Sequence, residues 1–190
     1  MPTTLIISNS RDVHADEIEN GLKLTGAIAV RLNTDRFVSD KIELVFRDCG
    51  IDQGISVNGK WLSFKEITSV VYRRPELPET VVTDIYQKEF AEKEAEEFIK
   101  QLYFYLDDAL WVSRHDCLER ARRKLNQLQV AKQYGMIVPK TLATNSPERV
   151  RIFYEEREGL IIYKTLRVPV IRMNEEQDFW SVPTTLLSQE

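Results

Sequence analysis

Two runs between Asp116 and Leu166 decide how the chain is interpreted: Arg120-Ala-Arg-Arg-Lys-Leu-Asn-Gln-Leu-Gln-Val-Ala-Lys-Gln-Tyr-Gly-Met-Ile-Val-Pro-Lys-Thr-Leu142 and Leu160-Ile-Ile-Tyr-Lys-Thr-Leu166. Around the first run, small and apolar residues recur every three or four positions, which is one face of an α-helix. They are Cys117, Ala121, Leu125, Leu128 and Ala131. This spacing predicts a helix that carries Lys124 and ends at Gly135.

A strand, a second helix and another strand are predicted to follow. Met136–Ala143 and Leu160–Leu166 are short apolar runs, which are typical of buried strands. Between them, Asn145 or Ser146 is expected to cap a helix that has a proline at its first position. The predicted order is helix, strand, helix, strand, and the last strand carries Lys164.

These runs resemble the opening of an ATP-grasp domain. The closest resemblance is to the ATP-grasp ribosomal peptide maturases, the microviridin-type graspetide synthetases, and the ribosomal-protein glutamate ligases are more distantly similar. The resemblance covers nearly the whole chain and implies an α/β fold. It implies a Rossmann-like pre-ATP-grasp domain over residues 1–112, with Tyr72-Arg-Arg-Pro75 at a strand end, and an incomplete ATP-grasp α+β subdomain over residues 113–190.

The resemblance also implies an activity. In this family, ATP activates a side-chain carboxylate of a ribosomally made precursor peptide as an acyl phosphate, and a lactone or lactam crosslink then closes. Lys124 and Lys164 match the nucleotide-binding lysines of the family. The magnesium ligands and the catalytic arginine come later in the family pattern, so we expect them beyond Glu190. This chain would then be the N-terminal part of a ligase and inactive alone.

Each lysine also has a simpler interpretation. Lys124 follows a basic run and would ordinarily be a solvated helix residue. Lys164 lies in an apolar run, and burial of an unpaired ammonium is costly, so the residues predict that it faces a ligand cleft or an acid. An edge-strand lysine is the alternative.

The N-terminal half begins as a parallel α/β unit. Thr3–Ser8 and Ala27–Leu32 are predicted strands, and Asp12–Leu24 between them is a predicted helix. A strand, helix, strand order implies a right-handed crossover and a parallel strand pair. A β-rich insertion with a hairpin turn at Asn58-Gly59 follows, ending in the strand Ile67–Tyr72.

Arg73 and Arg74 come directly after that last strand, and a long amphipathic helix is predicted between Thr83 and Asp108. Ligands of open α/β sheets bind at the carboxyl ends of strands, and an arginine fork suits a carboxylate or another anion. Successive strand residues point to opposite faces, so at most one of the two arginines should point into a given cleft. Solvent-facing arginines are the simpler alternative.

Composition excludes several classes of function. A net charge of -4 argues against a nucleic-acid surface, and the 190 residues contain no apolar run of about twenty residues for a membrane span. The N-terminus lacks a basic leader, and the only two cysteines are Cys49 and Cys117, which indicates reduced structural thiols in a cytoplasmic protein. No phosphate loop and no metal-ligand cluster is present, and His14 and His115 stand alone.

A second class of function stays open at this stage. The chain could be a short, non-catalytic module that keeps the pre-ATP-grasp fold in order to bind a peptide or a partner chain. A homodimer is also left open, and so are the identity of the peptide and the choice between ester and amide products.

Overall fold

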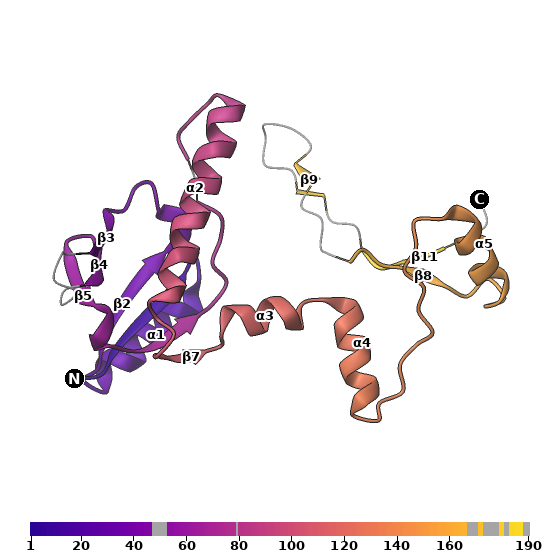
Figure 1. The fold of residues 1–190 in the computed structure, drawn as a ribbon, viewed down its shortest axis with the longest axis horizontal. Coiled ribbons are helices and arrows are strands. Elements are labelled where there is room, and N and C mark those ends of the chain that lie inside the picture. The colour runs from indigo at the N-terminus through magenta and orange to yellow at the C-terminus, as the bar shows by residue number, and fades with distance from the viewer. Residues whose placement is uncertain (47–52, 79, 167–170, 173–178, 181–182, 188–190) are drawn as a thin grey trace. The chain divides into compact units, whose positions relative to one another are not determined.

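The computed structural model describes residues 1–46, 53–78, 80–166, 171–172, 179–180 and 183–187 (Figure 1). The chain divides into two compact units, Met1–His115 and Asp116–Glu190. The sequence analysis placed the domain boundary after residue 112. Each unit is described by itself.

The first unit is built on a parallel sheet of four strands in the order β2-β1-β6-β7. The strands are β1 (Thr3–Ser8), β2 (Ile28–Asn33), β6 (Ile67–Tyr72) and β7 (Leu110–Val112). The central strand β1 is buried along its whole length, because both neighbours pair with it and both sheet faces are covered. The predicted parallel pair of β1 and β2 is therefore confirmed.

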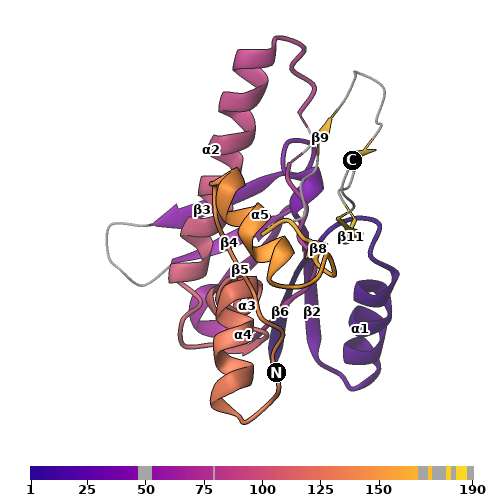
Figure 2. The ribbon, with the colours of Figure 1, turned by 90° about the vertical axis from the view of Figure 1, so that its right-hand side faces the viewer.

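Helices α1 (Val13–Leu24) and α2 (Ile85–Phe104) cover opposite faces of this sheet (Figure 2). Side chains alternate along a strand, so Ile6 packs on one face with Ala15 of α1. On the other face Leu5 packs with Leu102 of α2, in the larger of the two clusters. Because the side chains of β1 alternate between the two faces of the sheet, this one strand packs against both helices.

A second, antiparallel sheet lies in the sequence between β2 and β6. Its strands are β3 (Ile42–Phe46), β4 (Gln53–Val57) and β5 (Lys60–Ser63), with short 3-10 turns at Thr34–Arg36 and Phe64–Glu66 on either side. The predicted hairpin turn is present, because Val57 pairs with Lys60. Asn58 and Gly59 both have positive φ angles, 50° and 80°, as a type I′ turn requires.

Gly54 in β4 is a position where the close approach of two strands requires glycine. A Cβ atom at this position would collide with the carbonyl oxygen of Leu62 and lie 2.7 Å from Cζ2 of Trp61. We expect Gly54→Ala to lower the free energy of unfolding by roughly 1–3 kcal/mol, because backbone cannot yield as a side chain does. Urea unfolding would measure the change.

Gly21 in α1 is the matched control for this prediction. Its added Cβ would meet nothing within 4 Å, so Gly21→Ala should leave stability unchanged or raise it by up to about 1 kcal/mol. Equal effects of the two substitutions would contradict the packing described for β4 and β5.

The second unit contains three helices and short strand pairs within its described residues. The helices are α3 (His115–Ala121, beginning one residue before the unit), α4 (Lys124–Gln133) and α5 (Pro147–Glu155). The strands are β8 (Ile162–Tyr163) paired with β11 (Thr185–Leu186), and β9 (Ile171–Arg172) paired with β10 (Phe179–Trp180). The predicted cap of α5 is confirmed, because Ser146 Oγ accepts a hydrogen bond from the backbone N–H of Arg149 at 3.3 Å.

Three predicted elements of this unit differ from the structure. The single helix through Lys124 is two helices, because Arg123 adopts an extended conformation and caps α4. The carbonyl groups freed at the break are satisfied by side chains: Gln127 Nε2 donates to the carbonyl of Ala121 at 2.6 Å. Met136–Ala143 is not a strand, and the strand predicted at Leu160–Leu166 shortens to Ile162–Tyr163.

Met136–Ala143 is not a strand because it lacks a pairing partner in the described structure. Residues 136–143 are mostly exposed and have no strand partner among the described residues, whereas β8 pairs with β11. Periodicity reports which residues are apolar, but a strand forms only where a neighbour supplies hydrogen bonds.

None of the described helices combines the length and the apolar composition that a bilayer crossing requires.

Candidate nucleotide and anion sites

The fold brings the ammonium of Lys124 to the backbone next to Lys164 in the second unit. Lys124 is the first residue of α4, and its ammonium donates a hydrogen bond to the backbone carbonyl of Thr165. Thr165 is the immediate neighbour of Lys164. Positions forty residues apart in the sequence therefore meet at the end of β8.

Backbone pairing fixes the strand that carries this site. Tyr163 pairs with Thr185 of β11, and the N–H of Leu187 donates to the carbonyl of Ile161 at 3.0 Å. Ile161 is buried, whereas Lys164 is exposed. Two cationic groups at one strand end favour an anionic ligand such as a phosphate.

The sequence analysis placed Lys164 within a strand, and this placement was wrong. Lys164 lies one residue past the end of β8, and its exposed ammonium pays no desolvation penalty. A ligand role for Lys164 is supported instead by its position next to Thr165, whose carbonyl accepts the hydrogen bond from Lys124. Contact of Lys124 and Lys164 with a nucleotide stays a prediction.

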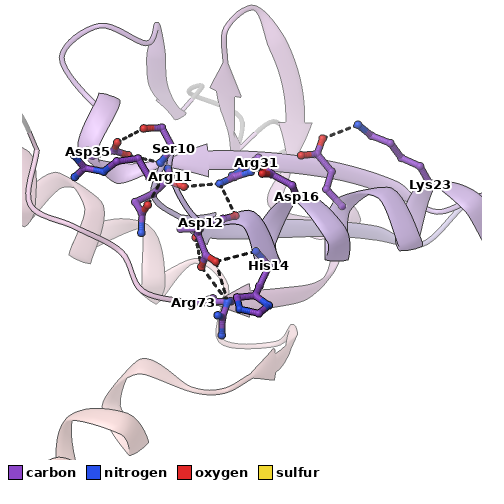
Figure 3. A network of polar contacts seen from close by, with 12 residues as sticks. Ser10, Arg11, Asp12, His14, Asp16, Lys23, Arg31, Asp35 and Arg73 are labelled. Carbon is purple, nitrogen blue, oxygen red and sulfur yellow. Dashed lines mark hydrogen bonds and ion pairs between the residues drawn. The ribbon is translucent and has the colours of Figure 1, made fainter.

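The first unit has a polar network at the carboxyl ends of its parallel strands (Figure 3). At its centre, Arg73 forms an ion pair with Asp12, with Nε 2.9 Å from Oδ2. Asp12 also caps α1, accepting from the N–H of His14 at 3.1 Å, and accepts from the hydroxyl of Ser8 at 3.1 Å. The carboxylate is only 3% exposed.

These contacts determine the ionisation of Asp12. Burial acts to raise its pKa, but the hydrogen bond from Ser8, the charge and hydrogen bond of Arg73 and the backbone hydrogen bond from His14 together outweigh burial, and the pKa of Asp12 lies below its ordinary value of 3.8. Asp12 is therefore a buried carboxylate that stays charged. Arg73 is engaged by an internal acid.

Further ion pairs and hydrogen bonds join the same strand ends. Asp35 accepts hydrogen bonds from the N–H of Ser10, at 2.9 Å, and from its hydroxyl. Arg31 pairs with Asp16 in the first turn of α1 (Figure 3). These contacts connect the loop after β1 to β2 and α1. Sequence reasoning missed this network, although an aspartate four residues after Ser8 at a helix start is a signal for it.

Arg74 differs from its neighbour. It is exposed, and its φ of 45° lies in the left-handed region, which non-glycine residues adopt rarely. Its backbone carbonyl accepts a hydrogen bond from Asn9 Nδ2 at 2.7 Å, which holds this turn in place. Of the two arginines predicted to contact an anion, Arg74 therefore has the more accessible side chain, and the contact itself stays a prediction.

The described parts of the chain contain neither a cluster of metal-ligating side chains nor a buried thiol. Across those residues, no three His, Cys, Asp or Glu side chains gather in a group that could hold an ion. Cys117 is an exposed free thiol on α3 rather than a buried one, and Cys49 lies outside the described residues.

The parallel sheet of the first unit, covered by helices on both faces, fits the Rossmann-like α/β class expected for a pre-ATP-grasp domain. A sequence model described as the MvdD pre-ATP-grasp domain matches residues 3–119. The chain belongs to this family. No curated protein matches it.

Solved structures extend the similarity over the whole chain. The macrocyclase MdnC bound with precursor peptide MdnA, from Microcystis aeruginosa MRC, is 29% identical with a TM-score of 0.85, over 98% of this chain and 61% of MdnC. Macrocyclase MdnB from the same organism is 27% identical with a TM-score of 0.78, over 100% of this chain and 62% of MdnB.

A third structure supports the fold alone. The Chryseobacterium gregarium RiPP-associated ATP-grasp ligase, in complex with ADP and a leader and core peptide, is 22% identical with a TM-score of 0.82, over 99% of this chain and 57% of that one. The chain thus spans about three fifths of the length of these structures.

Proposed function

We propose that this chain is the N-terminal portion of an ATP-dependent ligase that acts on a ribosomally made precursor peptide. The ligase activates side-chain carboxylates of the peptide as acyl phosphates, which a side-chain hydroxyl or amine then attacks to close lactone or lactam crosslinks. Family membership and the similarity to a macrocyclase bound with its precursor peptide support this reaction class.

The observation that carries the proposal is the hydrogen bond from Lys124 to the carbonyl of Thr165, the residue that follows Lys164 at the end of β8. A nucleotide polyphosphate needs cations and backbone donors that hold it in one orientation. The hydrogen bond to Thr165 holds the side chain of Lys124 in place. Lys164 supplies a second, exposed ammonium one residue after the end of β8. The two residues thus fit a phosphate, and their role is to bind and orient it.

The arginines of the first unit have a separate role in this proposal. Arg73 positions the end of β6 through Asp12, and Arg74 presents its guanidinium to a peptide carboxylate. The chain spans about three fifths of the length of MdnC and MdnB.

The test is a reaction of the native protein with ATP, magnesium and its precursor peptide, followed by mass spectrometry of the peptide. Each ring closure expels inorganic phosphate, which carries away one oxygen of the carboxylate, so the peptide becomes lighter by the mass of one water per ring, and only with ATP. A peptide that binds tightly but keeps its mass under all conditions would contradict the ligase and favour a non-catalytic peptide-binding module.

A further inference from the structure

The loop Arg73–Glu76, which follows β6, is held by two buried side chains that come from other strand ends. Asn9 and Thr34 directly follow β1 and β2, and they are only 4% and 1% exposed. Asn9 Nδ2 donates a hydrogen bond to the carbonyl of Arg74 at 2.7 Å. Thr34 Oγ1 donates to the carbonyl of Glu76 at 2.7 Å and accepts from its N–H at 2.9 Å. The backbone of the loop is therefore fixed at two points.

These contacts carry the loop across the carboxyl ends of three parallel strands. In the sheet, β1 lies between β2 and β6. The N–H of Arg73 donates to the carbonyl of Ile7 in β1 at 2.9 Å, and Thr34 lies just past the end of β2. The loop thus leaves β6, passes the end of β1 and reaches the end of β2. Open α/β sheets bind their ligands at this edge.

Arg74 is distinguished within this loop by its backbone and by its charge. Its φ of 45° is a conformation that glycine adopts without strain and arginine does not. Arg11, Arg31 and Arg73 each pair with an acid at this edge, whereas the exposed Arg74 forms no ion pair within the described part of the chain. A turn that served the fold alone would be better made by glycine, so the side chain of Arg74 points to a ligand.

We propose that Asn9 and Thr34 are positioning residues, which fix the backbone at Arg74 so that its guanidinium meets a carboxylate of the precursor peptide. This inference rests on the proposed function, in which Arg74 contacts that carboxylate. A guanidinium binds a carboxylate best through two parallel hydrogen bonds, and that geometry is lost when the backbone shifts. Both positioning side chains are buried, so they act through the loop and not on the peptide.

Isothermal titration without ATP, with two peptides, tests this role. One is the precursor peptide of the ligase assay, and the other is the same peptide with every glutamate and aspartate replaced by glutamine and asparagine. The native protein should bind the acidic peptide at least about tenfold more tightly. Arg74→Gly should remove most of this preference. It should keep the melting temperature within about 4 °C of the native value, because glycine relieves the left-handed φ.

The two positioning residues should affect the same preference. Thr34→Val keeps the shape of the side chain but removes its hydroxyl, and should lower the preference for the acidic peptide at least about threefold. Thr34→Ser keeps the hydroxyl and should restore the preference, and Asn9→Ala should act as Thr34→Val does. In an Arg74→Gly background neither Thr34→Val nor Asn9→Ala should lower it further, because the group that they position is gone.

Thr68→Val is the matched control. It makes the same substitution near the amino end of β6, where the hydroxyl of Thr68 donates to the carbonyl of Thr3 at 3.2 Å. This variant loses a hydrogen bond from a threonine to the backbone but leaves the loop Arg73–Glu76 intact. It should bind both peptides as the native protein does.

Several results would overturn the inference: a native protein without the preference, an Arg74→Gly variant that retains it, a Thr34→Val variant that equals the native protein, or a further loss in the Arg74→Gly background. Failure of the ligase proposal would look different. A protein that shows the preference and its loss in these variants, but never lowers the mass of the peptide with ATP, would reject the ligase and leave the positioning role in place.

Discussion

Alanine at Lys124 is expected to weaken binding of ATP by roughly 10- to 100-fold, the range for loss of one charge-assisted hydrogen bond. The substitution also removes the hydrogen bond that ties α4 to the carbonyl of Thr165. Lys164→Ala should weaken binding to a similar extent, because it removes the second ammonium at the same strand end. Isothermal titration of the complete protein with ATP would measure both.

Lys132→Ala is the matched control, since Lys132 is an exposed lysine near the opposite end of the same helix. It should leave the affinity for ATP unchanged. Because the two site lysines act on one ligand, the double variant should lose less than the sum of the two single effects. Unchanged affinity in both single variants would remove the basis for the nucleotide site.

Alanine at Asp12 is expected to lower the free energy of unfolding by about 2–4 kcal/mol, because it removes a helix cap and leaves a largely buried arginine unpaired. The side chain of Arg73 is 29% exposed, so water replaces its partner only in part. For a chain of this length the melting temperature should fall by roughly 5–15 °C. Thermal unfolding followed by circular dichroism would measure it.

The same carboxylate predicts a dependence on pH. The pKa of Asp12 is below 3.8 in the folded protein, so its contribution is fully present above that value and is lost as the pH falls through the folded pKa. The stability gap between the native protein and Asp12→Asn should therefore be widest near neutral pH and shrink below about pH 4. A gap that is constant with pH would contradict the ion pair.

Asp107→Ala is the control for this prediction. Asp107 also pairs with an arginine, Arg114, at 2.6 Å, but the two side chains are 66% and 40% exposed. Exposed ion pairs contribute about 0–1 kcal/mol, so its loss should cost far less than that of Asp12. The comparison separates a buried structural carboxylate from a surface one.

The sequence predicted the first unit well because its patterns are local. Thr3–Ser8 and Ile67–Tyr72 were placed at the residues where the structure has them, since apolar runs bounded by polar residues mark buried strands. The turn at Asn58-Gly59 followed from residues that tolerate positive φ. The second unit was predicted less well, because Met136–Ala143 has the composition of a strand but pairs with no strand in the part of the chain that the structure describes.

The sequence predicted which residues belong to the candidate sites, but not how their side chains are arranged. Lys124, Lys164, Arg73 and Arg74 were selected from the sequence, the lysines through the resemblance to the graspetide synthetases. The sequence could not show that Arg73 is engaged by Asp12, or that Lys124 reaches the carbonyl next to Lys164. Both contacts join residues more than forty positions apart, beyond the reach of any local pattern.

The sequence alone determined the order of elements in the first unit as far as α2, the parallel pairing of β1 and β2, and the set of cationic residues from which a site could be made. The tertiary structure decided which of these cations are held by internal acids and which are exposed to a ligand. The physical reason is that hydrophobic periodicity and turn chemistry act between neighbours in the chain, whereas the partner of a charge depends on how distant elements pack.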